Sequence, residues 1–134
     1  MFRLLRLYPL SALCIIVIWA LCLLKPPALP EGPQIPYLDK VVHFAMYFGL
    51  CSLLWFEHLK HAPKVRWTHF LPLGIIAPIA MSGLIELAQA YCTDTRSGDW
   101  MDFLANSFGV FLAIPFGLYA VRPLTLRFFH HPRA

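Results

Sequence analysis

Between two apolar segments of the chain stand Glu86-Leu-Ala-Gln89 and, after a short gap, Arg96-Ser-Gly-Asp99-Trp-Met-Asp102-Phe-Leu-Ala-Asn106-Ser-Phe-Gly109. The apolar segments are residues 71–85 before this stretch and residues 110–121 after it. Ionisable side chains are costly inside a bilayer, so those within apolar segments usually face the protein interior and have a function. The stretch therefore predicts a membrane fold with a polar site inside it.

The composition of the chain is that of a small integral membrane protein. Of its 134 residues, 59% are hydrophobic and only 13% are charged, and the mean hydropathy is +0.63. A soluble domain carries about 25% charged residues. We therefore predict one membrane domain over residues 1–134, without a separate soluble domain. The net charge of +4 does not indicate a nucleic-acid partner, because the basic residues lie at the ends of apolar segments.

Four apolar segments are candidates for membrane spans, which need about 20 residues each. They cover about residues 7–24, 40–56, 70–91 and 100–121. We predict an all-α four-helix bundle in which residues 57–69 form a polar connector. Arg3 and Arg6 precede the first segment as in a signal peptide, but no small-residue cleavage site follows, so we expect an uncleaved first span. Pro78 and Pro115 are expected to kink the last two spans.

The distribution of Lys and Arg predicts the orientation of these spans. Eight of these residues lie in the N-terminal tail, the second connector and the C-terminal tail, and three lie in the first and third connectors. Cytoplasmic loops of membrane proteins carry the excess of Lys and Arg. We therefore predict a multi-pass protein of the bacterial cytoplasmic (inner) membrane, with both termini in the cytoplasm.

Small residues recur every four positions in the last apolar segment, at Gly109, Ala113 and Gly117. A stripe of small residues on a transmembrane helix allows the backbone of a neighbouring helix to approach closely. We expect a close helix contact along this stripe.

Three of the predicted spans carry polar side chains to one layer near the outer surface. At about 1.5 Å of rise per residue, His43, Glu86 and Asn106 lie about 5–10 Å beneath the outer interface. Glu86 is the one acidic residue that we place well inside an apolar span. Other polar residues recur on the same helix faces at spacings of three or four; they are Asp39, Gln89, Asp99 and Asp102. This convergence predicts a site.

The residue types indicate two kinds of role at this site. Glu86, His43 and Asp102 are candidate catalytic residues, because carboxylates and imidazoles can exchange protons with a substrate. The candidates for binding a substrate are Asp39, Lys40, Gln89, Arg96, Asp99 and Asn106. Arg96 is the clearest anion-binding group of the outer loop, although it could also pair with a neighbouring aspartate in solvent.

Several of these residues have simpler interpretations. Asp39 and Asp99 each stand at the start of a predicted helix and could cap its N-terminus. Gln89 and Asn106 could hydrogen-bond to each other between two helices. Lys40 could anchor its span at the membrane interface.

The motifs of the predicted site follow one another in a defined order: Asp39-Lys40-x-x-His43, then Glu86-x-x-Gln89, then Arg96-x-x-Asp99-x-x-Asp102-x-x-x-Asn106-x-x-Gly109. Together they resemble the VanZ-like family of small multi-span membrane proteins. The family takes its name from a protein associated with reduced susceptibility to the glycopeptide teicoplanin. The resemblance therefore implies a function in the cell envelope, with glycopeptide resistance as one form of it, and assigns no particular reaction.

Two classes of function stay open at this point. In the first, the outer pocket binds a membrane lipid, a lipid-linked cell-wall component or a glycopeptide. In the second, the protein is a membrane-embedded enzyme acting on such a substrate, by acid–base chemistry or with a hard divalent metal held by the carboxylates and His43. The sequence names no cofactor and no oligomeric state, because it contains no established metal-binding motif, no C-x-x-C pair and no nucleophile-elbow serine.

Overall fold

The computed structural model describes residues 2–24, 36–93 and 98–130, and every regular element within these residues is a helix. In chain order the elements are α1 (Phe2–Leu7), α2 (Pro9–Leu23), α3 (Leu38–His61), α4 (Trp67–Leu71), the π-helical segment η1 (Pro72–Ile76), α5 (Ala77–Cys92), α6 (Trp100–Phe116), the π-helical segment η2 (Gly117–Val121) and α7 (Arg122–Phe129). The prediction of an all-α fold is confirmed for this part of the chain.

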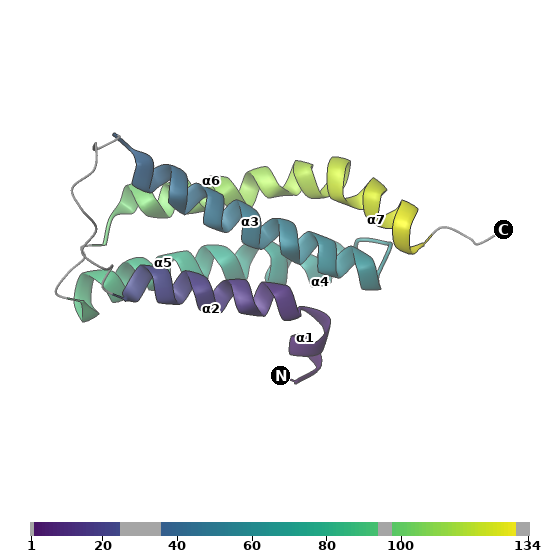
Figure 1. Cartoon of the computed structure of the whole chain (residues 1–134), viewed down its shortest axis with the longest axis horizontal. Helices are drawn as coiled ribbons and strands as arrows, with labels where there is room; N and C mark the ends of the chain where they lie inside the picture. Colours follow the sequence, from purple (N-terminus) through teal and green to yellow (C-terminus); the bar gives the residue numbers. More distant parts are fainter. Residues whose placement is uncertain (1, 25–35, 94–97, 131–134) are drawn as a thin grey trace.

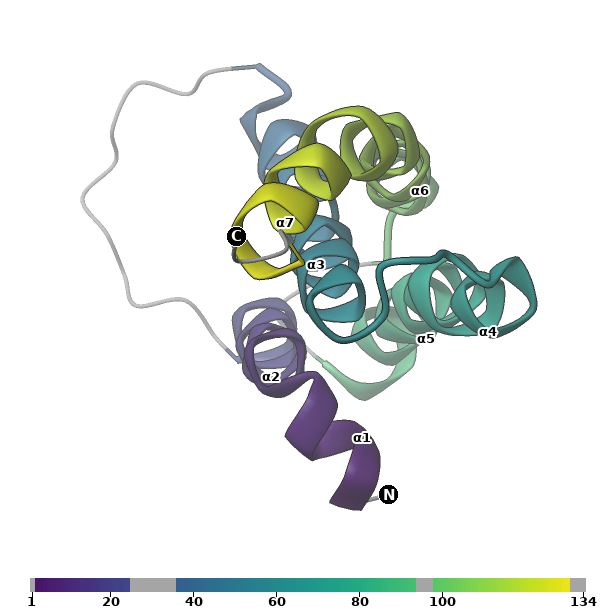
Figure 2. The ribbon, with the colours of Figure 1, turned by 90° about the vertical axis from the view of Figure 1, so that its right-hand side faces the viewer.

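The long helices α2, α3, α5 and α6 lie side by side along the longest axis of the molecule (Figures 1 and 2). Successive helices alternate in direction, so α1, α4 and α7 lie at one end together with both chain termini (Figure 1). We call the opposite end, where α2 and α5 finish and α3 and α6 begin, the polar end. Large buried side chains fill the space between the helices; the bulkiest are Trp55, Tyr47 and Phe70.

Two continuous helical stretches of the described chain are long and apolar enough to cross a membrane, as judged by length and composition. They are Trp67–Cys92, with 26 residues, and Trp100–Phe129, with 30 residues. Pro9–Leu23 is a shorter apolar helix. The helix α3 continues to His61, so residues 57–61 are helical. The prediction that residues 57–69 form a connector is therefore wrong for residues 57–61.

The helix α3 extends past the predicted span because Glu57 is buried against a neighbouring helix, with 3% of its surface exposed. Its carboxylate accepts hydrogen bonds from the backbone N–H groups of Leu10 at 2.8 Å and Ser11 at 3.0 Å, and from the Ser11 hydroxyl at 2.6 Å. The first N–H groups of a helix have no partner inside that helix, and Tyr8, the N-cap residue of α2, makes no side-chain cap bond. Glu57 thus caps α2 from α3. Glu57 is therefore a second buried acidic residue besides Glu86, where we expected a polar connector.

The stripe of small residues on α6 packs against α3, the helix with which α6 makes its most extensive contact. A Cβ atom at Gly109 would lie 2.6 Å from the carbonyl oxygen of Phe44, closer than real Cβ contacts come. One turn further on, Ala113 is fully buried, and Gly117 faces the indole ring of Trp55. The absence of side chains at these glycines lets α6 approach the backbone and the large aromatic rings of α3.

Pro78 and Pro115, the two prolines expected to kink the last two spans, stand beside the π-helical segments. Pro78 comes two residues after η1, and Pro115 comes two residues before η2. In η1 the N–H of Ala77 bonds to the carbonyl oxygen of Pro72, five residues back. A proline lacks the N–H that completes an α-helical turn, and a wider turn beside it accommodates the break.

Candidate functional site

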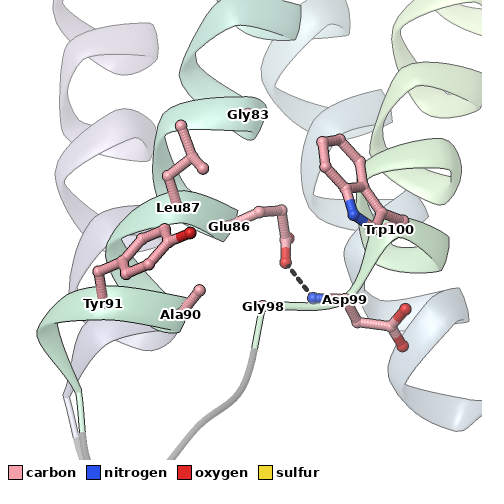
Figure 3. A pocket seen from close by; sticks show the side chains of 8 residues that line it. All are labelled: Gly83, Glu86, Leu87, Ala90, Tyr91, Gly98, Asp99 and Trp100. Carbon is pink, nitrogen blue, oxygen red and sulfur yellow. Dashed lines mark hydrogen bonds between the residues drawn. The ribbon is translucent and has the colours of Figure 1, made fainter.

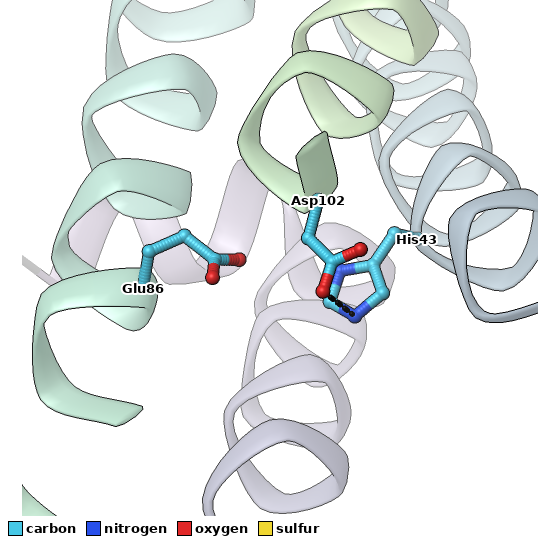
Figure 4. A group of neighbouring side chains, drawn as sticks. All are labelled: His43, Glu86 and Asp102. Carbon is cyan, nitrogen blue, oxygen red and sulfur yellow. Dashed lines mark ion pairs between the residues drawn. The ribbon is translucent and has the colours of Figure 1, made fainter. Parts of the chain in front are cut away.

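Three ionisable side chains from three different helices meet at the polar end (Figure 4). His43 comes from α3, Glu86 from α5 and Asp102 from α6, and each offers one ligand atom within 4.8 Å of the other two. His43 is 7% exposed and Glu86 is 6% exposed. The structure therefore brings together the three residues that we named as candidate catalytic residues.

Helical periodicity explains why these side chains point inward. On α3, His43 and Tyr47 are four residues apart and both are buried. On α5, Ser82 and Glu86 are likewise four apart and buried. Leu87, the next residue along the chain, lies on another face of the helix and is exposed. Residues three or four apart share a helix face, so at the polar end these polar side chains share the buried face of their helices.

The carboxylate of Glu86 is held by the backbone of the segment that leads into α6 (Figure 3). The N–H of Asp99 donates to Glu86 Oε2 at 2.9 Å. Gly98 lies so close to α5 that an added Cβ would collide with the carbonyl oxygen of Glu86, which explains the glycine at this position. A cavity of about 130 Å³ opens beside this contact, with Leu87, Ala90, Tyr91 and Trp100 in its walls.

Lys40 joins the carboxylates at the surface of the polar end. Its ammonium lies 2.8 Å from Asp39 Oδ2 and 2.7 Å from Asp102 Oδ1, and it also contacts Asp99 Oδ2. The hydrogen bond from Lys40 holds the pKa of Asp99 below its ordinary value. Lys40 is therefore a bridge between carboxylates of α3 and α6, a role that differs from the simple interface anchor considered above.

The structure distinguishes between the two aspartates considered as helix caps. Asp99 is the N-cap residue of α6, and its side chain accepts a hydrogen bond from the N–H of Met101 at 2.8 Å. Asp39 lies inside the first turn of α3, whose N-cap residue is Tyr37 with a left-handed φ of 61°. The capping interpretation holds for Asp99 and is wrong for Asp39.

Asn106 and Gln89 are both buried, but they do not bond to each other. The amide of Asn106 donates to the Ser82 hydroxyl at 2.8 Å. The amide of Gln89 donates to the carbonyl oxygen of Cys22 on α2 at 2.9 Å. The interpretation of a Gln89–Asn106 bond is therefore wrong, because Gln89 faces α2 whereas Asn106 faces the side of α5 that carries Ser82.

Two contributors to this site, Ser82 and Gly98, are absent from the residues predicted from the sequence. Ser82 stands next to Gly83, a pattern that is typical of close helix packing, and Gly98 carries no polar side chain that would mark it. Arg96, one of the predicted binding residues, lies outside the described residues.

A groove runs beside the cluster, between α2 and α3 at the polar end, with a volume of about 350 Å³. Its lining is mostly apolar but reaches two of the polar residues; it consists of Leu21, Cys22, Leu38, Asp39, Val42, His43 and Met46. The groove thus places apolar side chains next to the ionisable side chains of Asp39 and His43.

The residues of this site lie within a match to a known protein family. A family model described as VanZ/LLP1 matches residues 3–122 of the chain. The chain belongs to the VanZ/LLP1 family. The match covers the whole motif from Asp39 to Gly109, so the resemblance noted from the sequence is confirmed. No curated protein and no solved structure matches this VanZ/LLP1 chain.

Proposed function

We propose that this VanZ/LLP1 protein crosses the bacterial cytoplasmic membrane four times and binds the polar head of a cell-envelope amphiphile at its polar end. Both termini lie in the cytoplasm in this proposal, and the polar end faces outward. Support comes from the two helices of spanning length, from the position of both termini at one end of the bundle (Figure 1), and from the excess of Lys and Arg in the tails and the second connector.

The observation that carries the binding proposal is a buried acceptor without a donor. Glu86 Oε2 accepts the N–H of Asp99, but Glu86 Oε1 has no hydrogen-bond partner among the described residues. The same holds for Asn106 Oδ1. Leaving a buried acceptor unsatisfied costs about 1–3 kcal/mol, and more when it is charged. A ligand that brings hydroxyl, amide or ammonium donors would remove this cost.

The shape of the polar end fits an amphiphile. The groove beside His43 has apolar walls on which a hydrocarbon chain can lie, while the smaller cavity beside Glu86 suits one polar group of the head. Ligand sites are commonly apolar pockets with a few convergent polar groups. The groove lies between α2 and α3 and the cavity between α5 and the start of α6, so the polar end offers separate apolar and polar hollows.

The charge of the site favours a head rich in hydrogen-bond donors. Four carboxylates gather here, and among the described residues at this end Lys40 is the only lysine or arginine that faces them. Lys40 is already shared by three of these carboxylates, so a bare phosphate would meet repulsion. Sugars and peptides present many donors, and we therefore expect a lipid-linked cell-wall component or a glycopeptide.

Native mass spectrometry of the purified protein tests this proposal. The wild-type protein should retain a lipid-linked saccharide or peptide, and Glu86→Gln should lose it, because the amide cannot replace a carboxylate that accepts from both protein and ligand. Glu57→Gln is the matched control, since it makes the same chemical change at the opposite end and should retain the ligand. Equal retention by the wild type and Glu86→Gln, or loss in both variants, would contradict the proposal.

A further inference from the structure

We propose that His43, Glu86 and Asp102 form a binding site for a divalent first-row transition-metal ion of the Zn²⁺ or Fe²⁺ type. The ion would lie among the three side chains drawn in Figure 4, where the Asp102 carboxylate lies against the His43 ring and the Glu86 carboxylate extends toward this pair. This inference does not depend on the amphiphile proposed above. With an ion bound at Glu86 Oε1, Asn106 Oδ1 is the buried acceptor left for a donor group of the amphiphile.

The spacing of the ligand atoms fits a shared ion better than direct pairing. His43 Nε2 and Asp102 Oδ2 are 3.6 Å apart, which is too long for a hydrogen bond. Two atoms bound to one ion at about 2.0–2.2 Å can be up to about 4.4 Å apart, so 3.6 Å lies within this range. All three ligand atoms lie within 4.8 Å of one another, so a small rotation of the Glu86 side chain completes the set.

The ligands have unused capacity, which an ordinary packed cluster would not have. Glu86 and His43 are each more than nine-tenths buried. Within residues 2–24, 36–93 and 98–130, Glu86 Oε1 and His43 Nδ1 have no hydrogen-bond partner. Most buried polar atoms in proteins are satisfied, so each exception requires an explanation. A cation bound by Glu86 Oε1 supplies one for this carboxylate, and it uses the Nε2 of His43, the ring nitrogen that faces Asp102.

The donor set selects the class of ion. Imidazole nitrogen suits Zn²⁺, Fe²⁺ and Ni²⁺, whereas a site of oxygen ligands alone suits Mg²⁺ and Ca²⁺. One nitrogen and two carboxylates therefore favour a transition-metal ion. Three protein ligands also leave an open coordination position, which an oxygen of a bound head group could occupy.

A second group of acidic residues at this end does not carry the same inference. Asp39, Asp99 and Asp102 also lie close together, but the ammonium of Lys40 already contacts all three. Asp102 uses Oδ1 for Lys40, and its Oδ2 faces His43. The two oxygens of Asp102 thus face two different sites, one occupied by the Lys40 ammonium and the other proposed to bind the metal ion. We therefore expect one ion per chain.

Isothermal titration with metal alone tests the site in the purified full-length protein, after its tag has been removed and bound metal stripped with a chelator. We expect one Zn²⁺ per chain, with Mg²⁺ binding at least tenfold more weakly. Glu86→Gln and Asp102→Asn should each weaken Zn²⁺ binding at least tenfold. The matched controls are Glu57→Gln and His61→Gln, which change a carboxylate and an exposed imidazole far from the site and should leave the affinity unchanged.

X-ray absorption of the Zn²⁺-loaded protein gives a readout that does not depend on the stability of the variants. The expected first shell contains nitrogen and oxygen without sulfur. Absence of stoichiometric binding, unchanged affinity in Glu86→Gln and Asp102→Asn, or a sulfur ligand would each overturn the metal site. Retention of the amphiphile by a protein that binds no metal would reject this inference while leaving the proposed function intact.

Discussion

Replacing Gly109 by alanine should push α3 and α6 apart. The added Cβ would lie 2.6 Å from the carbonyl oxygen of Phe44 and 2.9 Å from the backbone nitrogen of Phe48, whereas ordinary van der Waals contact begins at 3.4 Å. Both neighbouring atoms belong to the backbone of α3, so no side chain can rotate away to relieve the contact. The helices must therefore separate by several tenths of an ångström.

The expected cost follows from two opposing effects. Overpacking of this kind costs about 1–3 kcal/mol, and replacement of a helical glycine by alanine gains about 1 kcal/mol in helix propensity. Since the contacts are with backbone atoms, we expect the upper part of the first range and a net destabilisation of about 1–2 kcal/mol. His43 precedes Phe44, so the same separation should move His43 away from Asp102.

Gly49 provides the matched control for this prediction. It lies in the interior of α3, and a Cβ added there would meet nothing within 4 Å. Gly49→Ala should therefore stabilise the protein by about 0.5–1 kcal/mol. The assay is the free energy of unfolding in mixed micelles, measured by titration with a denaturing detergent. If Gly109→Ala were as stable as Gly49→Ala, the close contact between α3 and α6 would be refuted.

Three further changes test other contacts of the fold and site. Glu57→Ala removes the cap of α2 and should lower the free energy of unfolding by about 2–3 kcal/mol; a loss below about 0.5 kcal/mol would argue against the cap. Gly98→Ala should displace the N–H of Asp99 from Glu86 and weaken amphiphile binding at least tenfold with unchanged circular dichroism, and full binding would exclude the tight approach to α5. Because Lys40 lowers the pKa of Asp99, their pair stabilises the fold above the ordinary aspartate pKa of about 3.9 and is lost as the pH falls through the lowered value. Lys40→Met should therefore raise the Asp99 pKa in an NMR titration, and an unchanged pKa would contradict the pairing.

The meeting of His43, Glu86 and Asp102 could be anticipated because it depends on two regularities. Helical rise fixes the depth of a residue in an apolar segment, and a spacing of three or four fixes its face. Alternating helix directions then bring the start of α3, the end of α5 and the start of α6 to one end. None of these steps requires knowledge of which helices are neighbours.

Two of the incorrect interpretations, those of Gln89 and Glu57, required knowledge of neighbouring helices, and that of Asp39 required the exact start of a helix. The partner of Gln89 depends on which side of α5 faces α2, and helical spacing alone does not reveal this. The role of Glu57 arises from the N-terminus of α2, more than 40 positions earlier in the chain, and its charge next to histidines and lysines suggested a solvent-exposed connector. Asp39 was placed as a cap because the helix was expected to begin after it, whereas α3 begins at Leu38.

Photo-crosslinking in intact cells tests the central claim, that the polar end binds the head of an envelope amphiphile, most directly. A photoreactive amino acid at Leu87, in the wall of the cavity beside Glu86, is compared with one at Leu124, in an apolar groove on α7. We predict that the adduct at position 87 carries a sugar- or peptide-bearing lipid, is abolished by Glu86→Gln and persists in Glu57→Gln, while position 124 yields bulk phospholipid alone. Bulk phospholipid alone at both positions would contradict the account.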